Sequence, residues 1–133
     1  MSKIIQNAIK THDGVILCST YTHDFVTHGD YSLDGGKEYI KISYPVDHKD
    51  DFEGLFIYEE DSIEVIKSKL VWGTVDKNNK IKYVKLYDCT IEHLQNILKH
   101  GILNKLYKET ILYIIDEKLK QLRYKKIMKL KNV

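Results

Sequence analysis

The chain has 133 residues, of which 43% are apolar and 30% charged, so it is long enough for one compact domain and too short for two independent cores. Its 21 Lys and Arg residues against 19 Asp and Glu leave a net charge of +2, so its overall field selects no particular class of partner. No apolar run approaches the roughly 18 residues that span a bilayer, which excludes a membrane-spanning helix.

The first half of the chain predicts a mostly antiparallel sheet of short strands. These strands are expected over residues 4–10, 15–21, 25–27, 31–33 and 37–44. The dipeptide Asp13-Gly14 predicts a hairpin turn between the first two, because both residues tolerate a positive φ. In the last of them, alternation places Ile40 and Ile42 on one face and Tyr39 on the other.

The second half predicts a loop, a hairpin and helices. The polar stretch 45–54 is expected to be a loop, and a brief strand over 55–58 and a short helix capped by Asp61 or Ser62 follow. A second hairpin is expected over 70–75 and 81–86. Thr90 is expected to cap a helix that ends at Gly101, and Asn104 to cap the last helix. That helix carries an apolar stripe formed by Tyr107, Ile111, Ile114, Ile115, Leu119 and Leu122.

These elements predict an α+β fold, a mostly antiparallel sheet followed by two C-terminal helices, in a single domain over residues 1–133. Charge is unevenly distributed along this domain: residues 47–64 hold eight acidic residues and one Lys, whereas every charge from Lys118 to Lys131 is positive. This asymmetry favours self-association or contact between the C-terminal tail and an anion. The last helix therefore has two interpretations, one as a cover for the sheet and one as an oligomerisation element.

The sequence predicts neither a metal centre nor a nucleophilic site. Cys18 and Cys89 are the only cysteines; two buried thiols are expected, and a disulfide between them is the alternative. The first residues show no signal-peptide pattern, so an intracellular protein is expected. No paired Cys-x2-Cys or His-Glu-x-x-His spacing supports zinc, and no Gly-x-Ser-x-Gly elbow, Walker loop or Gly-x-Gly-x-x-Gly is present. We therefore expect no cofactor.

Aromatic residues near the second hairpin raise the question of nucleic acids. Tyr83, Tyr87 and Trp72 are placed so that they would stack bases, as in single-strand-binding proteins. The small net charge and the confinement of basic residues to one helix end argue against a polymeric nucleic acid. A small nucleotide needs the same stacking and only a few donors, so it remains a candidate ligand.

The most informative stretch is Thr22-His23-Asp24-Phe25-Val26-Thr27-His28-Gly29, followed by Asp34-Gly35-Gly36. It gathers imidazoles, carboxylates and an aromatic ring among strand-forming residues, a combination that points to ligand binding at a sheet rim. Asp34-Gly35-Gly36 is read most simply as a turn with positive φ. Its functional interpretation is a backbone that a ligand approaches closely, with amides free for an anion.

These motifs carry a family resemblance. The runs Asn7-Ala8-Ile9-Lys10, His23-Asp24-Phe25-Val26-Thr27-His28 and Leu33-Asp34-Gly35-Gly36, with Glu38-Tyr39-Ile40, resemble a domain widespread in proteins of tailed phages and prophages. The likeness covers roughly residues 4 to 100. Many members carry Cys pairs beside the His-Asp-Phe segment, where this chain has Thr11-His12-Asp13-Gly14 and His28-Gly29, so no zinc knuckle is expected. Within this set, the chain resembles the Thoeris anti-defence sponges of the first type.

The resemblance implies a non-enzymatic function. Such sponges bind the cyclic ADP-ribose isomers made by host TIR-domain enzymes, and in some members cyclic oligonucleotides, and assemble into dimers or larger rings. By this likeness the chain is expected to be a homo-oligomer that sequesters a cyclic nucleotide in the host cytoplasm, away from any membrane, without cleaving it. The alternatives are a phage protein that binds and inhibits a host protein, or a small enzyme that acts on nucleotides.

The resemblance also suggests roles for particular residues. The expected ligand-binding set is His23, Asp24, Phe25, Asp34, Gly35, Gly36, Tyr39, Trp72, Lys118, Arg123 and Lys125. In it, Trp72, Tyr39 or Phe25 stacks on adenine, Asp24 and Asp34 accept from ribose hydroxyls, and the cations and the two glycine amides meet phosphate. Simpler roles stay open: Phe25 and Trp72 as core residues, Asp24 as a turn cap, and the lysines as solvated groups. Arg123 is the only Arg, so Lys must replace the bidentate arginines expected near the C-terminal helices.

Overall fold

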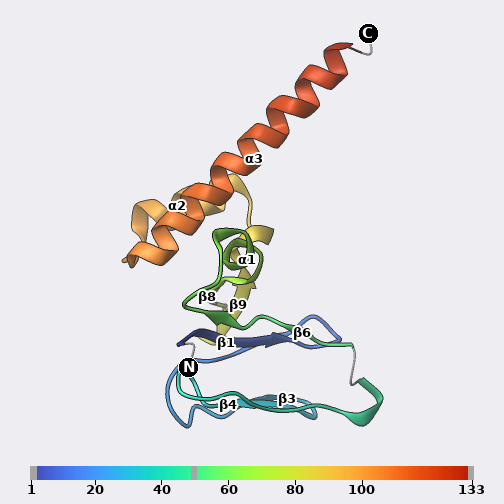
Figure 1. Cartoon of the computed structure of the whole chain (residues 1–133), viewed down its shortest axis with the longest axis vertical. Helices are drawn as coiled ribbons and strands as arrows, with labels where there is room; N and C mark the ends of the chain where they lie inside the picture. Colours follow the sequence, from blue (N-terminus) through green and yellow to red (C-terminus); the bar gives the residue numbers. More distant parts are fainter. Residues whose placement is uncertain (1–2, 49–50, 132–133) are drawn as a thin grey trace.

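Antiparallel sheets stack in layers below a group of helices in the computed structural model, which describes residues 3–48 and 51–131 (Figure 1). The predicted α+β class is confirmed, although the sheet is divided into three. The strands are β1 (Ile4–Lys10), β2 (Ile16–Ser19), β3 (Val26–His28), β4 (Tyr31–Asp34), β5 (Lys41–Ser43), β6 (Glu53–Gly54), β7 (Ile57–Tyr58), β8 (Val71–Val75) and β9 (Ile81–Lys85). The helices are α1 (Ile63–Lys69), α2 (Ile91–His100) and α3 (Lys105–Lys131), with 3-10 turns η1 (Val46–His48) and η2 (Leu86–Asp88).

Strand β1 is the centre of the middle layer. It pairs with β2 on one side and with β6 and β7 on the other, while β3, β4 and β5 form the lower sheet and β8 and β9 a separate hairpin. The expected hairpins around Asp13-Gly14 and around residues 76–80 are confirmed. The loop expected over 45–54 contains η1 and the two-residue strand β6 within its described residues.

Each interface between layers has its own apolar cluster. Ile9 of β1 lies over Tyr31 and Leu33 of the lower sheet, and Ala8, its neighbour on the opposite face, packs toward Val71 of β8. The other face of the β8–β9 hairpin, with Trp72 and Val84, packs against a third cluster that includes the helices. Its buried residues are Ile57, Ile66, Leu70, Leu86, Cys89, Leu94, Ile97, Ile111, Ile114 and Ile115. Alternation along β1 therefore serves both neighbouring layers, as the pleat of a strand requires.

Two buried amide side chains on β1 tie these layers together. Gln6 donates from Nε2 to the carbonyls of Leu55 (2.9 Å) and Lys69 (2.7 Å), and its Oε1 accepts from the amide of Val71 at 2.9 Å. Asn7 donates from Nδ2 to the carbonyls of Asp34 (3.2 Å) and Tyr39 (3.1 Å) in the lower sheet. The adjacent polar pair Gln6-Asn7 therefore fixes the middle sheet against the hairpin above and the turn below.

The helices begin where the capping residues predict. The hydroxyls of Ser62 and Thr90 accept from the amides of Val65 and His93, and Asn104 Oδ1 accepts from the amide of Tyr107 at 3.0 Å. No helix within the described residues is long and apolar enough to cross a membrane.

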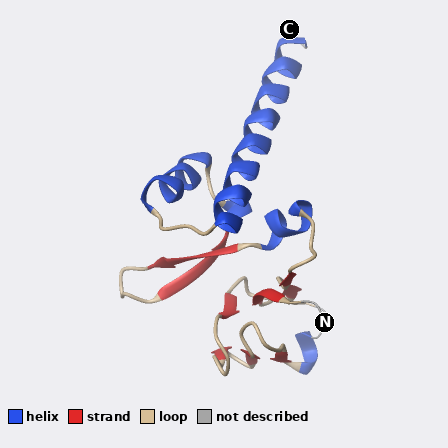
Figure 2. Cartoon of the chain, turned by 60° about the vertical axis from the view of Figure 1, so that its left-hand side comes forward, coloured by secondary structure: helices blue, strands red, loops and turns tan. Residues whose placement is uncertain are grey.

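Helix α3 changes character half-way along its 27 residues. Its first half packs against α1, α2 and η2, and Ile111, Ile114 and Ile115 are buried there. The last two residues of the predicted apolar stripe lie beyond this packed region: the side chain of Leu119 is 38% exposed and that of Leu122 54% exposed. The second half projects away from the remaining elements and carries the C-terminus, in Figures 1 and 2 alike. The helix thus covers the β8–β9 hairpin with one half, whereas its other half projects beyond the rest of the chain that the structure describes.

Candidate functional site

The His-Asp-Phe segment builds a braced turn. Oδ2 of Asp24 accepts from the backbone amide of Thr20 at 2.8 Å and from the Thr20 hydroxyl at 3.1 Å. The carbonyl of Asp24 accepts from the hydroxyl of Ser19 at 2.7 Å. Asp24 is therefore the turn cap that the simpler interpretation describes, and its carboxylate already holds two donors.

Both amides of Gly35 and Gly36 are also used within the protein. The amide of Gly35 donates to Oδ1 of Asp34 at 2.8 Å, and the buried amide of Gly36 donates to the hydroxyl of Ser19 at 2.9 Å. The expectation that these amides are free for an anion is therefore wrong. Their positive φ values, 112° and 54°, confirm the turn interpretation.

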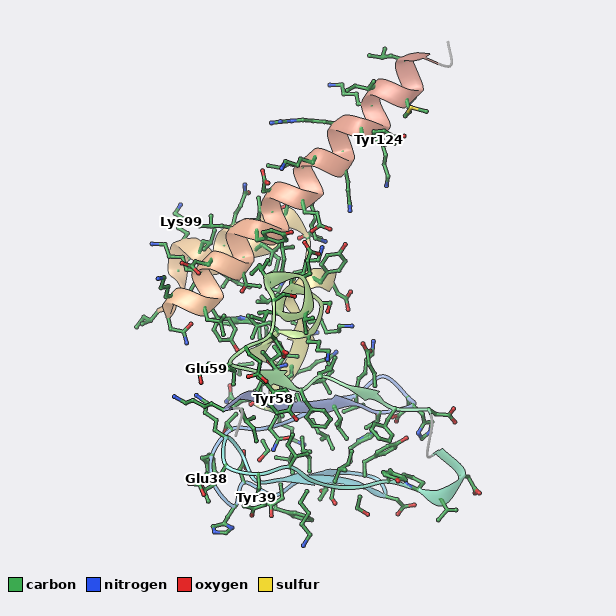
Figure 3. All side chains as sticks on the ribbon, viewed as in Figure 1. Glu38, Tyr39, Tyr58, Glu59, Lys99 and Tyr124 are labelled. Atoms are coloured by element: carbon green, nitrogen blue, oxygen red, sulfur yellow. The ribbon has the colours of Figure 1, made fainter. Side chains whose placement is uncertain are left out.

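A chain of polar contacts closes the same end of the lower sheet. The hydroxyl of Tyr39 donates to Oδ2 of Asp34 at 3.1 Å and lies 3.1 Å from Nδ1 of His23. Desolvation and the hydrogen bond to Asp34 raise the pKa of Tyr39, so the phenol stays a neutral donor. Phe25 is 63% exposed beside this turn, so it is not a core residue. In Figure 3, Tyr39 lies at the far end of the molecule from α3.

The remaining predicted residues lie elsewhere. Trp72 is half-buried and packs edge-on against Tyr107, with their ring centroids 5.8 Å apart. Nζ of Lys118 lies 5.2 Å from the centroid of the Tyr87 ring. Arg123 and Lys125 are exposed on the projecting half of α3. The structure therefore brings His23, Asp24, Phe25, Asp34, Gly35, Gly36 and Tyr39 together and separates them from Trp72, Lys118, Arg123 and Lys125.

A cleft between the two hairpins is the better candidate for a binding site. We call it the β9 cleft. It has a volume of about 360 Å³ and runs along β9, from the β1–β2 hairpin to the start of α2. It is lined by Lys10, Gly14, Ile16, Lys82, Tyr83, Val84, Lys85, Asp88, Cys89, Thr90 and His93. Three lysines against one aspartate make this cleft electropositive.

Local structure explains how these side chains reach one place. Tyr83 lies opposite Gly73 in the hairpin register, and a Cβ on Gly73 would come within 3.3 Å of its ring. The glycine therefore leaves room for the tyrosine ring, one side of which packs on the Ala8 cluster. Lys85 is held by Glu53, with Nζ 3.2 Å from Oε1. Because Glu53 pairs with Lys85, the excess positive charge of the cleft comes from Lys10 and Lys82.

The start of α2 adds donors to the same cleft. Thr90 caps the helix by accepting from the amide of His93 at 3.1 Å. The cap therefore uses the His93 amide, and only the amides of Ile91 and Glu92 before it are left at the helix end, where the helix dipole favours an anion. Glu92, the acidic residue of the first turn, offsets part of this field and is exposed.

The thiol in the β9 cleft is a poor nucleophile. Burial, and next the charge of Asp88, raise the pKa of Cys89, so the protonated form dominates at neutral pH. Burial raises the pKa of Cys18 to about 12. Both cysteines are free and buried, which confirms the prediction of buried thiols.

The cleft continues past the tips of the hairpins. A second hollow of about 460 Å³ shares Gly14, Ile16, Lys82 and Tyr83 with it and adds Lys80. Its two acidic residues are engaged locally: Asp76 accepts from backbone amides, and Asp13 bonds to Thr11 and to Nε2 of His28. Those contacts, that with Thr11 first, lower the pKa of Asp13 to about 2.

The sequence contained a partial signal for this cleft. Lys80-Ile81-Lys82-Tyr83-Val84-Lys85 places basic and aromatic residues along one strand, and Tyr83 is one of the three aromatic residues that the sequence offers for base stacking. Lys10 and His93 come from distant segments, and only the tertiary fold places them beside β9.

Within residues 3–48 and 51–131, no group of three or more His, Cys, Asp or Glu side chains is arranged to hold a metal ion. No family model, curated protein or solved structure matches this chain.

Proposed function

We propose that the protein binds a nucleotide-type signal in the β9 cleft and retains it without chemical change. The observation that carries this proposal is that Lys10, Lys82 and Lys85 line one cleft together with Tyr83 and with Thr90 and His93 at the start of α2. The ligand class is the one that the phage-sponge resemblance implies, a cyclic ADP-ribose isomer or a related cyclic nucleotide. The same resemblance implies a homo-oligomer in the cytoplasm of an infected host cell.

The chemistry of the β9 cleft suits each part of such a ligand. A pyrophosphate would meet the ammonium groups of Lys10 and Lys82 near the positive end of the α2 dipole. A base would lie on the ring of Tyr83, since stacking is tolerant of base identity. The volume of about 360 Å³ falls within the range of small-molecule sites.

The cysteine of the cleft is unsuited to nucleophilic turnover. Burial raises the pKa of the Cys89 thiol, so it stays protonated. Sequestration needs a slow dissociation rate at a stoichiometric site and no leaving group or base.

The proposal is tested by capture and release. The protein is mixed with cyclic ADP-ribose, passed through a size filter and heat-denatured, and the released compound is identified by mass spectrometry. We expect intact ligand at one equivalent per site. Released linear ADP-ribose, or no retained ligand from a panel of cyclic ADP-ribose isomers and cyclic oligonucleotides, would refute the proposal.

A pair of matched variants locates the site. Lys10→Ala/Lys82→Ala removes two cations of the β9 cleft and is expected to weaken binding by about a hundredfold or more, since each charge-assisted contact contributes on the order of 1.5–3 kcal/mol. Lys99→Ala/Lys108→Ala removes two exposed lysines of the helices that lie outside the cleft lining and is expected to bind normally. Equal affinity in the two double variants would exclude the β9 cleft.

A further inference from the structure

The projecting half of α3 exposes several large apolar side chains to solvent, and no described part of the chain covers them. Leu119, Leu122, Ile127 and Leu130 are 38%, 54%, 52% and 70% exposed. Tyr124, on the same half, is 65% exposed and lies clear of the domain (Figure 3). Exposed apolar surface of this extent, gathered on one element, indicates an interaction surface.

The charge of this half makes the isolated helix unfavourable. Every charged residue from Lys118 to Lys131 is positive, and pairs such as Lys125 and Lys129 are separated by one helical turn. Like charges at this spacing destabilise a helix. A partner that covers the apolar residues and neutralises these cations would stabilise the observed helix.

One face of α3 carries both the apolar and the charged groups that such a partner needs. Leu112, Asp116, Leu119, Arg123, Ile127 and Leu130 follow one another at spacings of three and four residues. They fall within an arc of about 80° around the helix at 3.6 residues per turn. Leu112 is 49% exposed, and the Asp116 side chain is 65% exposed, so the face is open along both halves.

We infer that this face pairs with the same face of a second copy of the chain, with the two α3 helices antiparallel. The acidic residue of the face lies in its first half and the basic residue in its second half. An antiparallel pair therefore places Asp116 opposite the partner subunit's Arg123, and Leu112 opposite the partner subunit's Ile127. A twofold axis near Leu119 makes both contacts occur twice.

A parallel pair is disfavoured by the same charges. It would place Arg123 against the partner subunit's Arg123, and Asp116 against the partner subunit's Asp116. The present contact of Asp116, with Lys120 at 3.1 Å on its own helix, is an exposed pair of small energy and does not prevent the exchange.

This inference uses α3 alone and does not depend on the β9 cleft. The molar mass of the full chain is measured by light scattering and by sedimentation over a range of concentrations. We expect a dimer that dissociates on dilution, and Leu119→Glu is expected to weaken association by at least tenfold. A protein that stays monomeric at every concentration would overturn the inference, as would one that dimerises only with co-purified nucleic acid.

A charge-exchange series tests the direction of pairing. Asp116→Lys and Arg123→Asp each place like charges opposite one another in the antiparallel pair and should weaken association. The double variant Asp116→Lys/Arg123→Asp restores opposite charges and should recover the dimer, whereas in a parallel pair it would not. Lys125→Asp, on the other side of α3, is the control and should leave the dimer unchanged. Circular dichroism verifies the helix in each variant, and failure of the double variant to recover the dimer would refute antiparallel pairing.

Discussion

Replacing Gly36 by Ala tests whether the Asp-Gly-Gly motif is primarily structural, and Gly29→Ala provides a matched control. The two glycines have almost the same backbone conformation, with φ values of 54° and 58°. A Cβ on Gly36 would lie 2.4 Å from the carbonyl carbon and oxygen of Tyr21, whereas a Cβ on Gly29 would have no neighbour within 4 Å. The two substitutions therefore carry the same cost of placing Ala in the left-handed conformation, and only Gly36→Ala adds a steric clash with the backbone of Tyr21.

The expected magnitudes follow from these two contributions. The left-handed conformation costs a non-glycine residue about 1–2 kcal/mol, and Gly29→Ala should lower the free energy of unfolding by about that amount. Forcing a methyl group into a packed site adds about 1–3 kcal/mol, so Gly36→Ala should cost about 2–5 kcal/mol in total. The gain from a less flexible unfolded chain is the same for both and cancels in the comparison.

Urea unfolding measures both variants under identical conditions. The fluorescence of Trp72, the only tryptophan, and far-ultraviolet circular dichroism should give coincident transitions. Equal losses of stability in the two variants would show that the backbone of Tyr21 moves aside freely. In that case the bonding of the Gly36 amide to Ser19 would not define the turn.

Three further outcomes follow from the fold. The free energy of unfolding should fall as the pH rises from about 9 toward 12, because the Cys18 thiol has a pKa of 9.0 in the unfolded chain and about 12 in the native protein. In Cys18→Ala, the free energy of unfolding should depend less steeply on pH in this range. Leu94→Ala removes a side chain with no exposed surface and should cost about 2–5 kcal/mol in urea unfolding, whereas the exposed Val75→Ala should cost under about 0.5 kcal/mol. The ammonium group of Lys67 forms ion pairs with Glu117 of α3 and Glu64 of α1 and lies between the rings of Tyr87 and Tyr113. Lys67→Ala should therefore accelerate amide hydrogen exchange in the first half of α3 more than the control Lys120→Ala does. Equal exchange rates in the two variants would contradict a role of Lys67 in holding α3 against α1.

Local signals in the sequence predicted most of the elements. The hairpin turns, the caps Ser62, Thr90 and Asn104, and the helical spacing of Leu94 and Ile97 act over a few residues, and the structure confirms them. The division of the sheet into three layers was not predictable in this way. It depends on the two faces of β1 and on the contacts of Gln6 and Asn7, which join segments separated by 27 to 65 residues.

The candidate site was less predictable than the fold because polar residues have two possible uses. Asp24 and Asp34 have side chains suited to ligand binding, yet both hold backbone amides of the turn. A sequence shows which groups are polar and not whether the fold has already paired them. For the β9 cleft the difficulty is reversed, because Lys10 and His93 appear unremarkable in isolation and gain meaning only beside Tyr83.

This distribution of polar groups bears on how far a shared motif carries a shared function. The amides and carboxylates of the Asp-Gly-Gly turn are paired internally, so a chain with this motif needs it to connect β4 and β5 whatever the chain binds. In the function proposed above, ligand affinity would be set by residues outside the motif, the lysines that line the cleft with Tyr83, which can change without disturbing that turn. Two proteins with the same Asp-Gly-Gly turn are therefore expected to share the lower sheet, and to share a ligand only where their β9 clefts carry similar charge and an equivalent aromatic ring.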